Sequence, residues 1–468
     1  MNHGVNVGEQ ATSVSTPVVA DSGIPFVVGT APVQSAENPA KKGVPVLCTS
    51  WDEAVDKLGY SDNWKKYSLC EFMYSHFKLY GCQPVIFCNV LDTSKATPVA
   101  ASDMDVTDHK VKLPIEAIRT SVAVKSATGS ALVLDTDYGM FTEGEYVVIE
   151  LLPGSAAYES ESVNVAYSAI SGEVEAADVA EGFEAAELCL TLLGTTPDLF
   201  VAPGWSHKPA IAAVMATKAA NTNGVFGGKA LIDVDCTATG AVSYTAATTQ
   251  KVVNNLTDKD MCPCWPMLTL GDRVFHYSTQ LAGLIAQVDR NNGGIPYESP
   301  SNKNLKCDGL CLADGTEVLL THAQANQLNA AGITTAINFV NGWVAWGNWT
   351  GCYPANTDVK DNLLPVSRMF DWVGNTLVKT FWSKLDQPMN RRLIDSILDS
   401  ANIWLNGLVG QQYLLGARVE MIEAENPLEK LMAGIIKLHV YLTPPGPAQE
   451  IDFVLEYDAS YVSSALQD

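Results

Sequence analysis

The sequence predicts a multi-domain protein of the α/β (α+β) class, with a discontinuous α/β core, an all-β insertion and a helical C-terminal domain that ends in strands. Three observations support this fold class. Apolar strand patterns alternate with helical patterns on both sides of a hairpin-rich stretch at 97–190. The C-terminal third has the long 3.6-residue apolar periodicity of helices. The chain has 468 residues, which is too long for one ordinary core.

The first part of the α/β core is predicted over residues 23–96, where two apolar strand patterns enclose two helical patterns. In chain order these are "GIPFVVGTAPV" (23–33), "SWDEAVDKLGY" (50–60), "SLCEFMYSHFKLYG" (68–81) and "PVIFCNVL" (84–91). Ser50 is a typical helix N-cap before an acidic first turn, and Gly81 is a typical helix C-cap. This β-α-α-β order predicts an α/β layer.

The insertion, residues 97–190, is predicted to consist of hairpins. Short strand patterns alternate with Gly and Asp turns, as in "ALVLDTDYGMFTEGEYVVIELLPG". The segment holds 17 acidic and 4 basic residues, so it carries −13 of the chain's net charge of −23. We interpret it as a solvated outer domain. The overall negative charge argues against direct binding of nucleic acid, which needs a basic surface.

The second part of the core, residues 191–360, returns to alternating strand and helix patterns. These are "DLFVAPGW" (198–205), "KPAIAAVMATKAANTNG" (208–224), "KALIDVDC" (229–236), "TTQKVVNNL" (248–256), "CPCWPMLTLG" (262–271) and "FHYSTQLAGLIAQVDRNNG" (275–293). The α/β core is therefore interrupted by the insertion and then resumes.

The helical domain is predicted over residues 361–446, and arms are predicted at both ends of the chain. Apolar residues recur at helical spacing in 364–385 and 390–416, and "IIKLHVYLTP" (435–444) alternates like a strand. Residues 1–22 form an N-terminal arm without a core of its own. In the C-terminal arm, 447–468, one strand face is apolar; it comprises Ile451, Phe453, Leu455 and Tyr457.

Motifs for catalysis, cofactors or metals are not recognised, so no residue is assigned to any of these roles and the protein is not predicted to be an enzyme. "NGVFGGKALIDVD" (223–235) lacks the spacing of a phosphate loop, and Ser206 beside His207 lacks the second glycine of a nucleophile elbow. The eleven cysteines have no zinc-ligand spacing and are interpreted as buried thiols. A site assembled from distant residues remains open.

Membrane insertion and secretion are also not predicted. No apolar run approaches the ~20 residues that span a bilayer. The start, "MNHGVNVGEQATSVSTPVV", lacks the basic and apolar regions of a signal peptide. The protein is therefore expected to be made in the cytoplasm.

Several stretches in order resemble contractile tail sheath proteins of bacteriophages and phage-tail-like bacteriocin particles. They are "HGVNVGEQATSVSTPVVADSGIPFVVGTAPV" (3–33), "PDLFVAPGW" (197–205), "LNAAGITTAINFVNGWVAWGNWT" (328–350), "PVSRMFDWVGNTLVKTF" (365–381), "QPMNRRLIDSILDSANIWLNGLVGQQYLLGA" (387–417) with "ENP" (425–427), and "EIDFVLEY" (450–457). Together they cover the α/β and C-terminal parts, and the insertion lies where the family varies.

The resemblance implies a helical homo-oligomer, six-start and built of hexameric rings, around an inner tail tube protein. In that family both arms reach neighbouring subunits and complete their sheets, and an unpaired strand at a chain end fits this role. We therefore expect Val5 and Val7 of the first arm, and Ile451, Phe453, Leu455 and Tyr457 of the second, to pair between subunits. The proline-rich stretch 444–447 is the expected hinge or semi-rigid spacer. The alternative is that the last strand folds back onto 435–444 of the same subunit.

The resemblance also implies contraction by rigid-body rotation of subunits, in a tail sheath of a virion or phage-tail-like particle made in the bacterial cytoplasm. Further partners would be baseplate and tail terminator proteins. Lys379, Lys384, Arg391 and Arg392 are the candidate tube-facing residues, with ordinary solvated helix faces as the alternative. Two other functions stay open: an α/β metabolic enzyme with a β insertion, which needs a convergent polar pocket, and a particle-surface adhesin that binds through 97–190.

Overall fold

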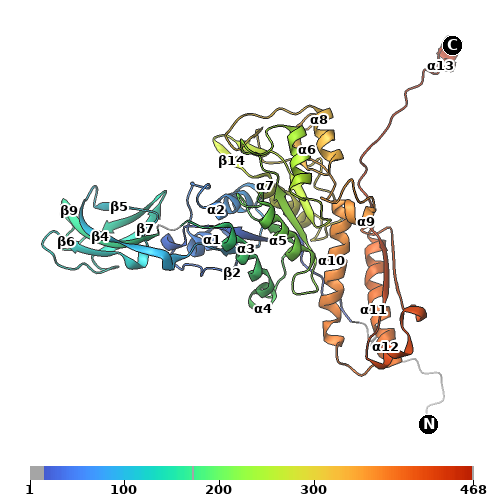
Figure 1. Cartoon of the computed structure of the whole chain (residues 1–468), viewed down its shortest axis with the longest axis horizontal. Coiled ribbons are helices and arrows are strands. Elements are labelled where there is room, and N and C mark those ends of the chain that lie inside the picture. The colour runs from blue at the N-terminus through green and yellow to red at the C-terminus, as the bar shows by residue number, and fades with distance from the viewer. Residues whose placement is uncertain (1–14, 171–172, 466–468) are drawn as a thin grey trace.

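The computed structural model describes residues 15–170 and 173–465. Three parts follow one another along an elongated molecule: a β-rich insertion at one end, an α/β core in the middle and a helical domain at the other end (Figure 1). The last segment runs away from the rest of the molecule to a short helix, α13 (Ser460–Ala465).

The α/β core is built on a six-stranded sheet with the strand order β12-β11-β10-β1-β3-β2. Its strands are β1 (Pro25–Gly29), β2 (Pro45–Cys48), β3 (Val85–Asn89), β10 (Leu199–Val201), β11 (Lys229–Asp233) and β12 (Met261–Cys264). All neighbouring strands pair in parallel except β2, which is antiparallel to β3. The central strand β1 is buried along its whole length, as expected for a parallel sheet covered on both faces.

Helices cover both faces of this sheet and form two separate apolar cores. One face packs against α2 (Ser68–Met73), η2 (Tyr74–Tyr80) and α7 (Tyr277–Asn291). The other packs against α3 (Ala176–Gly182), η5 (Phe183–Leu188), α5 (Pro209–Ala220) and α6 (Tyr244–Val253). Phe26 and Val27, successive residues of β1, point into the two different cores.

Local signals account for the first helices as expected. The Ser50 side chain accepts a hydrogen bond from the Glu53 N–H at the start of α1 (Trp51–Leu58). The helix predicted over 68–81 forms as α2 continued by the π-helical η2, and it ends at Gly81 in the left-handed conformation (φ 58°). Further short elements complete the core: β13 (Met267–Leu270), β14 (Arg273–Phe275), β15 (Gly309–Cys311), α8 (His322–Ala330), β16 (Thr335–Asn338) and β17 (Trp343–Trp346).

The insertion consists of two three-stranded sheets, in the orders β4-β9-β6 and β5-β8-β7, around their own apolar core. The strands are β4 (Ala96–Asp105), β5 (Lys110–Pro114), β6 (Ala123–Ser126), β7 (Tyr138–Glu143), β8 (Tyr146–Leu151) and β9 (Ser162–Ile170). The expectation of an all-β segment up to residue 190 is wrong for its last part. α3, η5 and α4 (Cys189–Leu193) occupy 176–193 as helices, and they cover the core sheet.

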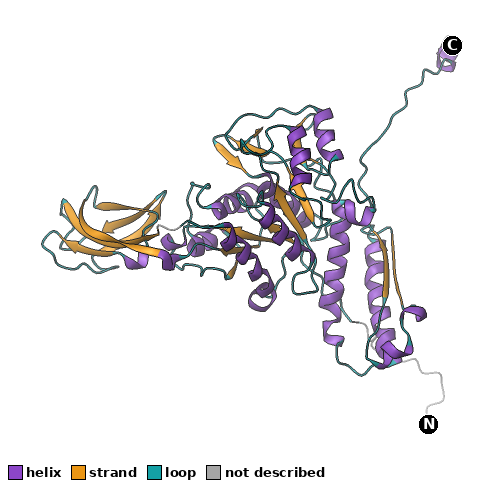
Figure 2. Ribbon diagram, in the orientation of Figure 1, coloured by secondary structure: helices purple, strands orange, loops and turns teal. Residues whose placement is uncertain are grey.

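The helical domain combines two long helices with a two-stranded sheet (Figure 2). Its elements are α9 (Val359–Asn362), α10 (Leu364–Phe381), α11 (Arg391–Gly410), β18 (Gly416–Glu420), α12 (Leu428–Met432) and β19 (His439–Thr443). β18 and β19 pair antiparallel and pack against α11. The Asn402 amide of α11 exchanges two hydrogen bonds, of 2.9 and 2.8 Å, with the backbone of Val419 in β18. This clamp fixes the sheet to the helix.

All eleven cysteines lie within the described residues and are free thiols. Ten of them are buried, and Cys307 is partly exposed. Burial raises the pKa of Cys48, Cys88 and Cys262 to about 12. These thiols therefore act as apolar core groups, as the sequence predicts.

Candidate functional site: the helical domain and its arms

Helix α10 contacts the α/β core through a polar stripe made of Arg368, Asp371 and Asn375. The spacing of three and then four residues puts them on one face of the helix. Asn375 exchanges hydrogen bonds of 2.9 Å with both the N–H and the carbonyl of Gly227, just before β11. Polar contacts therefore join this face of α10 to the α/β core, beside the apolar contact of Leu364.

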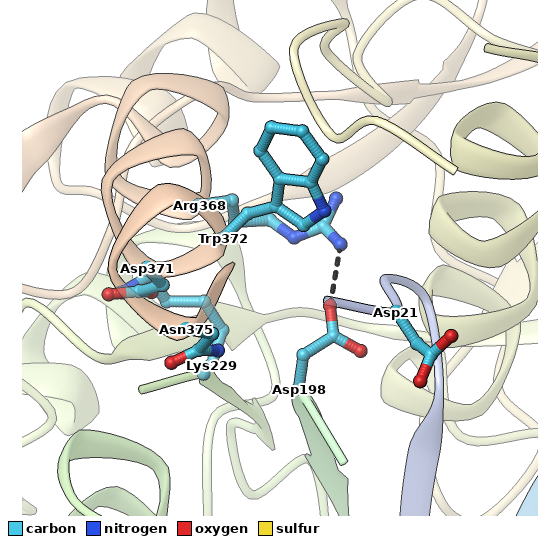
Figure 3. A pocket seen from close by; sticks show the side chains of 8 residues that line it. Asp21, Asp198, Lys229, Arg368, Asp371, Trp372 and Asn375 are labelled. Carbon is cyan, nitrogen blue, oxygen red and sulfur yellow. Dashed lines mark hydrogen bonds and ion pairs between the residues drawn. The ribbon is translucent and has the colours of Figure 1, made fainter. Parts of the chain in front are cut away.

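Arg368 forms the first ion cluster of this junction (Figure 3). Its guanidinium, 4% exposed, donates to both carboxylate oxygens of Asp289 at 3.0 and 2.5 Å and to Asp198 at 2.9 Å. Asp198 also accepts from the backbone N–H groups of Gly23 and Ile24, where β1 begins. Burial alone would lower the pKa of Arg368, but the two carboxylates raise it overall. Arg368 stays charged and joins α10, α7 and the start of β1.

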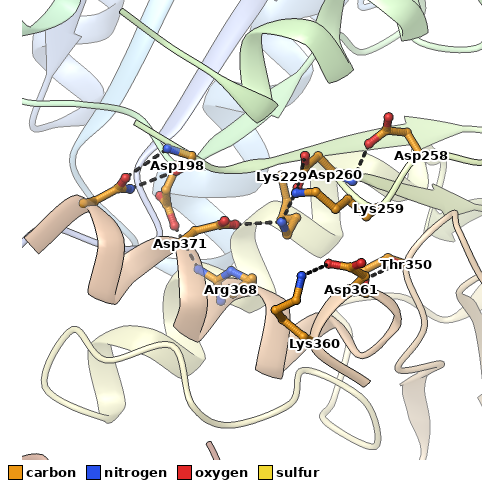
Figure 4. A network of polar contacts seen from close by, with 12 residues as sticks. Asp198, Lys229, Asp258, Lys259, Asp260, Thr350, Lys360, Asp361, Arg368 and Asp371 are labelled. Carbon is orange, nitrogen blue, oxygen red and sulfur yellow. Dashed lines mark hydrogen bonds and ion pairs between the residues drawn. The ribbon is translucent and has the colours of Figure 1, made fainter. Parts of the chain in front are cut away.

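Lys229 forms the second ion cluster (Figure 4). Its fully buried ammonium lies 2.5 Å from Asp260 and 2.7 Å from Asp371 of α10. Burial lowers the pKa of Lys229, and the carboxylates of Asp371 and Asp260 more than offset this and raise it. Lys229 belongs to the glycine-rich stretch 223–235, which superficially resembles a phosphate loop. Its ammonium is paired with two carboxylates, so it is not available to bind a phosphate. Such a buried pair fixes a geometry more than it adds stability.

The terminal residues expected to pair between subunits stand free of the subunit. The side chains of Ile451, Phe453, Leu455 and Tyr457 are 70, 85, 94 and 81% exposed. Residues 451–457 form no strand ladder, and β19 pairs with β18. The alternative in which this segment folds back onto 435–444 of the same subunit is therefore not what the structure shows. Val5 and Val7 lie outside the described residues.

Three of the four candidate tube-facing residues gather at the turn between α10 and α11. Lys384 is partly exposed, and Arg391 and Arg392 are exposed. Arg391 pairs with Asp395, one helical turn away, at 3.0 Å. Lys379 differs because its side chain is only 12% exposed and lies 3.5 Å from Asp21 of the N-terminal arm. Exposed apolar residues flank the basic group, including Trp382 at 61%.

An apolar groove of ≈ 680 Å³ opens beside this turn. It is lined by the end of α10, the start of α11 and the residues leading into β19, among them Phe381, Ile394 and Leu438. Within the described chain, β18 and β19 pair only with each other, so each keeps one open edge. An open edge next to an apolar groove is a surface that accepts another strand.

The carboxyl edge of the parallel sheet, where α/β proteins usually bind ligands, is filled by its own side chains. Ser206 is fully buried and donates to Asp233 at 2.8 Å, and Ser278 donates to the same carboxylate at 2.5 Å. Nearby, His276 contacts the buried Glu71 at 2.7 Å, and this carboxylate raises the pKa of His276 to about 9 against the opposing effect of burial. Ser206 and His207 thus form no nucleophile elbow.

Within residues 15–170 and 173–465, no cluster of His, Cys, Asp and Glu is placed to hold a metal ion. The same part of the chain has no helix that is both long and apolar enough to cross a bilayer. Sequence reasoning missed the two ion clusters, because Asp198 and Arg368 are 170 positions apart. The sequence signal for these clusters was a charged residue within a mostly apolar stretch, such as Arg368 in 364–377.

Comparisons with known proteins agree with the architecture. No family model matches the chain. The sequence is 25% identical to the tail sheath protein of Burkholderia phage BcepMu over 481 aligned residues, which cover 98% of this chain and 97% of that protein. The fold matches the contracted helical sheath of the anti-feeding prophage (TM-score 0.59, 15% identity, covering 97% of this chain and 99% of that one). It matches equally the contracted PVC sheath complex, an extracellular contractile injection system (TM-score 0.59, 16% identity, covering 98% and 99%).

Proposed function

We propose that this chain, a homologue of phage tail sheath protein over nearly its full length and with the fold of contractile sheaths, is a structural sheath subunit. It assembles with copies of itself into a helical sheath of a phage or phage-tail-like particle. The sheath surrounds an inner tail tube, and its contraction drives that tube through a target cell envelope. Its ends bind baseplate and tail terminator proteins.

The observation that carries this proposal is the exposed alternating face at the C-terminus. Four large apolar residues at alternate positions of 451–457 are 70–94% exposed in their own subunit. Burying each would contribute roughly 1.5–3 kcal/mol, before the entropy of ordering the segment is subtracted. A second subunit offers the matching surface, because its β18–β19 sheet has open edges beside an apolar groove. Ile451, Phe453, Leu455 and Tyr457 therefore complete a neighbour's sheet.

The N-terminal arm makes the corresponding exchange through Val5 and Val7, which alternate as a short strand does. Two exchanged arms leave each subunit linked to its neighbours at both ends. The links permit a rigid-body change of packing while the mesh of subunits stays connected.

The turn between α10 and α11 faces the tube. Lys384, Arg391 and Arg392 concentrate positive charge there in a chain whose net charge is −23, and Trp382 adds an exposed aromatic side chain. An acidic tube surface would complement this group. The insertion lies at the opposite end of the elongated subunit, so it forms the outer surface of the sheath (Figure 1).

Negative-stain electron microscopy tests the proposal with the intact chain and three variants. The intact chain forms long hollow tubes. A chain truncated after Gly446 and the variant Phe453→Asp fail to form them, because the apolar face is lost or charged. Val454→Asp is the matched control, since Val454 is 92% exposed and lies on the opposite face of the segment. It retains tubes.

Compact particles from every chain would overturn the sheath proposal and favour the metabolic enzyme. Tubes from the truncated chain would keep the sheath and overturn the C-terminal exchange. Equal loss of tubes in Phe453→Asp and Val454→Asp would show that charge, rather than burial of one face, controls assembly.

A further inference from the structure

Residues 15–22 of the N-terminal arm lie along α10 of their own subunit, held by a ladder of side-chain hydrogen bonds. The Val18 N–H donates to the Thr380 hydroxyl at 2.9 Å, and the Ala20 N–H donates to the Thr376 hydroxyl at 3.0 Å. The Trp372 indole N–H donates to the Ala20 carbonyl at 2.9 Å. Bonds to backbone groups at alternate arm positions define a register.

The geometry of the two elements explains this register. Two residues of an extended chain advance about 6.6 Å. Four residues of an α-helix advance about 6.0 Å, and they return to nearly the same face. Thr376 and Thr380 are one four-residue step apart, so each presents its hydroxyl to one of two alternate arm residues, Ala20 and Val18. Trp372, one step further, binds the carbonyl of the same Ala20. A shift of the arm by one residue would turn its bonding groups away from α10.

Further contacts fix both ends of this segment. At its start, the Ser15 N–H donates to the Ser400 hydroxyl of α11 at 2.8 Å. Near its end, Asp21 pairs with Lys379, and the Ser22 hydroxyl donates to the Gly294 carbonyl at 2.8 Å. Ala20 is 3% exposed and belongs to the apolar core of the helical domain. From Ser15 onward the arm is thus part of that domain.

We propose that residues 15–22 are an anchor that stays on α10 and α11 of its own subunit when subunits assemble, so these residues are not exchanged with a neighbour. This inference rests on the proposed sheath function and assigns the anchoring to Trp372, Thr376 and Thr380 as positioning residues. Force from a neighbour on the arm then reaches α10, rather than the first strand of the core sheet.

The anchor also limits the reach of the exchange. A fully extended chain from Val7 to Ser15 spans at most ~29 Å. The part of the neighbouring sheet that accepts Val7 therefore lies within about that distance of Ser400, the residue that holds Ser15.

Amide hydrogen exchange on the unassembled full-length chain tests the anchor itself. The Val18 and Ala20 amides are protected in the wild-type chain, and Thr376→Val with Thr380→Val, nearly isosteric changes, speeds their exchange about tenfold or more. The amides of β1 serve as the internal control and keep their protection. Unprotected Val18 and Ala20 amides in the wild-type chain would overturn the proposal, whatever the outcome for assembly.

A cross-link tests whether the anchor must leave α10 for assembly. Asp21→Cys and Lys379→Cys are joined by a short bismaleimide in a Cys307→Ser background, which removes the one partly exposed native thiol. Cross-linked subunits form tubes as well as the same variant left unlinked. Loss of tubes on cross-linking alone would show that the segment must leave α10 for assembly and would overturn the anchor. If the unlinked variant and the wild type both formed no tubes, the sheath proposal would fail, and the exchange data would still decide the anchor.

Discussion

Arg368→Met is the sharpest test of the polar junction between α10 and the α/β core. Met has a similar length and no charge, so the substitution leaves Asp289, 1% exposed, and Asp198, 12% exposed, without their shared cation. Asp198 keeps two backbone N–H donors, from Gly23 and Ile24. Asp289 loses a bidentate partner and receives no replacement from the methionine.

Removing one partner of a buried ion pair lowers the free energy of unfolding by about 3–5 kcal/mol, because the other charge stays buried without a counter-charge. We expect the lower part of this range, since the backbone donors still stabilise the Asp198 carboxylate. Burial already raises the pKa of Asp198 in the wild-type chain, with Arg368 opposing it. Without Arg368 the folded state binds a proton there more readily than the unfolded state does, so the deficit shrinks as the pH falls.

Urea denaturation, followed by tryptophan fluorescence at several pH values, measures the effect. Arg391→Met is the matched control, because Arg391 is 89% exposed and its pair with Asp395 is worth only about 0.3–0.5 kcal/mol. Arg368→Met combined with Asp289→Asn recovers part of the loss. A loss below ~1 kcal/mol for Arg368→Met, or the same loss for Arg391→Met, would refute the assignment of the junction to buried charge.

The remaining predictions concern pH, and urea midpoints against pH check each of them. Burial lowers the pKa of His76 to about 3, and its ring nitrogens have no hydrogen-bond partner among the described residues. Stability therefore falls by about 2 kcal/mol from pH 7 to pH 5, and His76→Phe flattens this slope. The His276–Glu71 pair adds stability that is complete below pH 6.5 and lost as the pH rises through about 9, and Glu71→Gln removes that loss. Burial lowers the pKa of Lys251 to about 8, so between pH 8 and pH 10.5 the unfolded state binds more protons than the folded state. The wild-type chain therefore gains stability as the pH rises through this window, and Lys251→Met does not. A pH profile unchanged by the substitution contradicts each assignment.

Local sequence signals predicted much of the α/β core. The Ser50 cap, the glycine at 81 and the β-branched runs act over a few residues, so they are visible in the chain itself. The helices at 176–193 were missed because this acidic segment was assigned to the same insertion as the acidic hairpins before it. Their alanine and glutamate content, and the capping box between Glu175 and Asp178, were the overlooked helix signals.

The candidate site was less predictable, because its contacts join distant parts of the chain. Thr376 meets Ala20 across 356 positions, and no local pattern links an arm to a helix over that separation. The arm was therefore interpreted as one piece, whereas residues 15–22 belong to the helical domain. The alternating apolar face of 451–457 was easier to recognise, since alternation is a property of the segment alone, and its pairing with a neighbour stays a prediction.

The buried thiols bear on how the proposed sheath would persist outside the cell that makes it. Oxidation and thiol exchange proceed through the thiolate, and burial suppresses both its formation and its contact with oxidants. Even Cys307, the partly exposed thiol, has a pKa raised to about 12 by burial. The described thiols are therefore expected to stay reduced in an oxidising environment, so a sheath of the proposed kind would keep the same core chemistry inside and outside the cell that makes it.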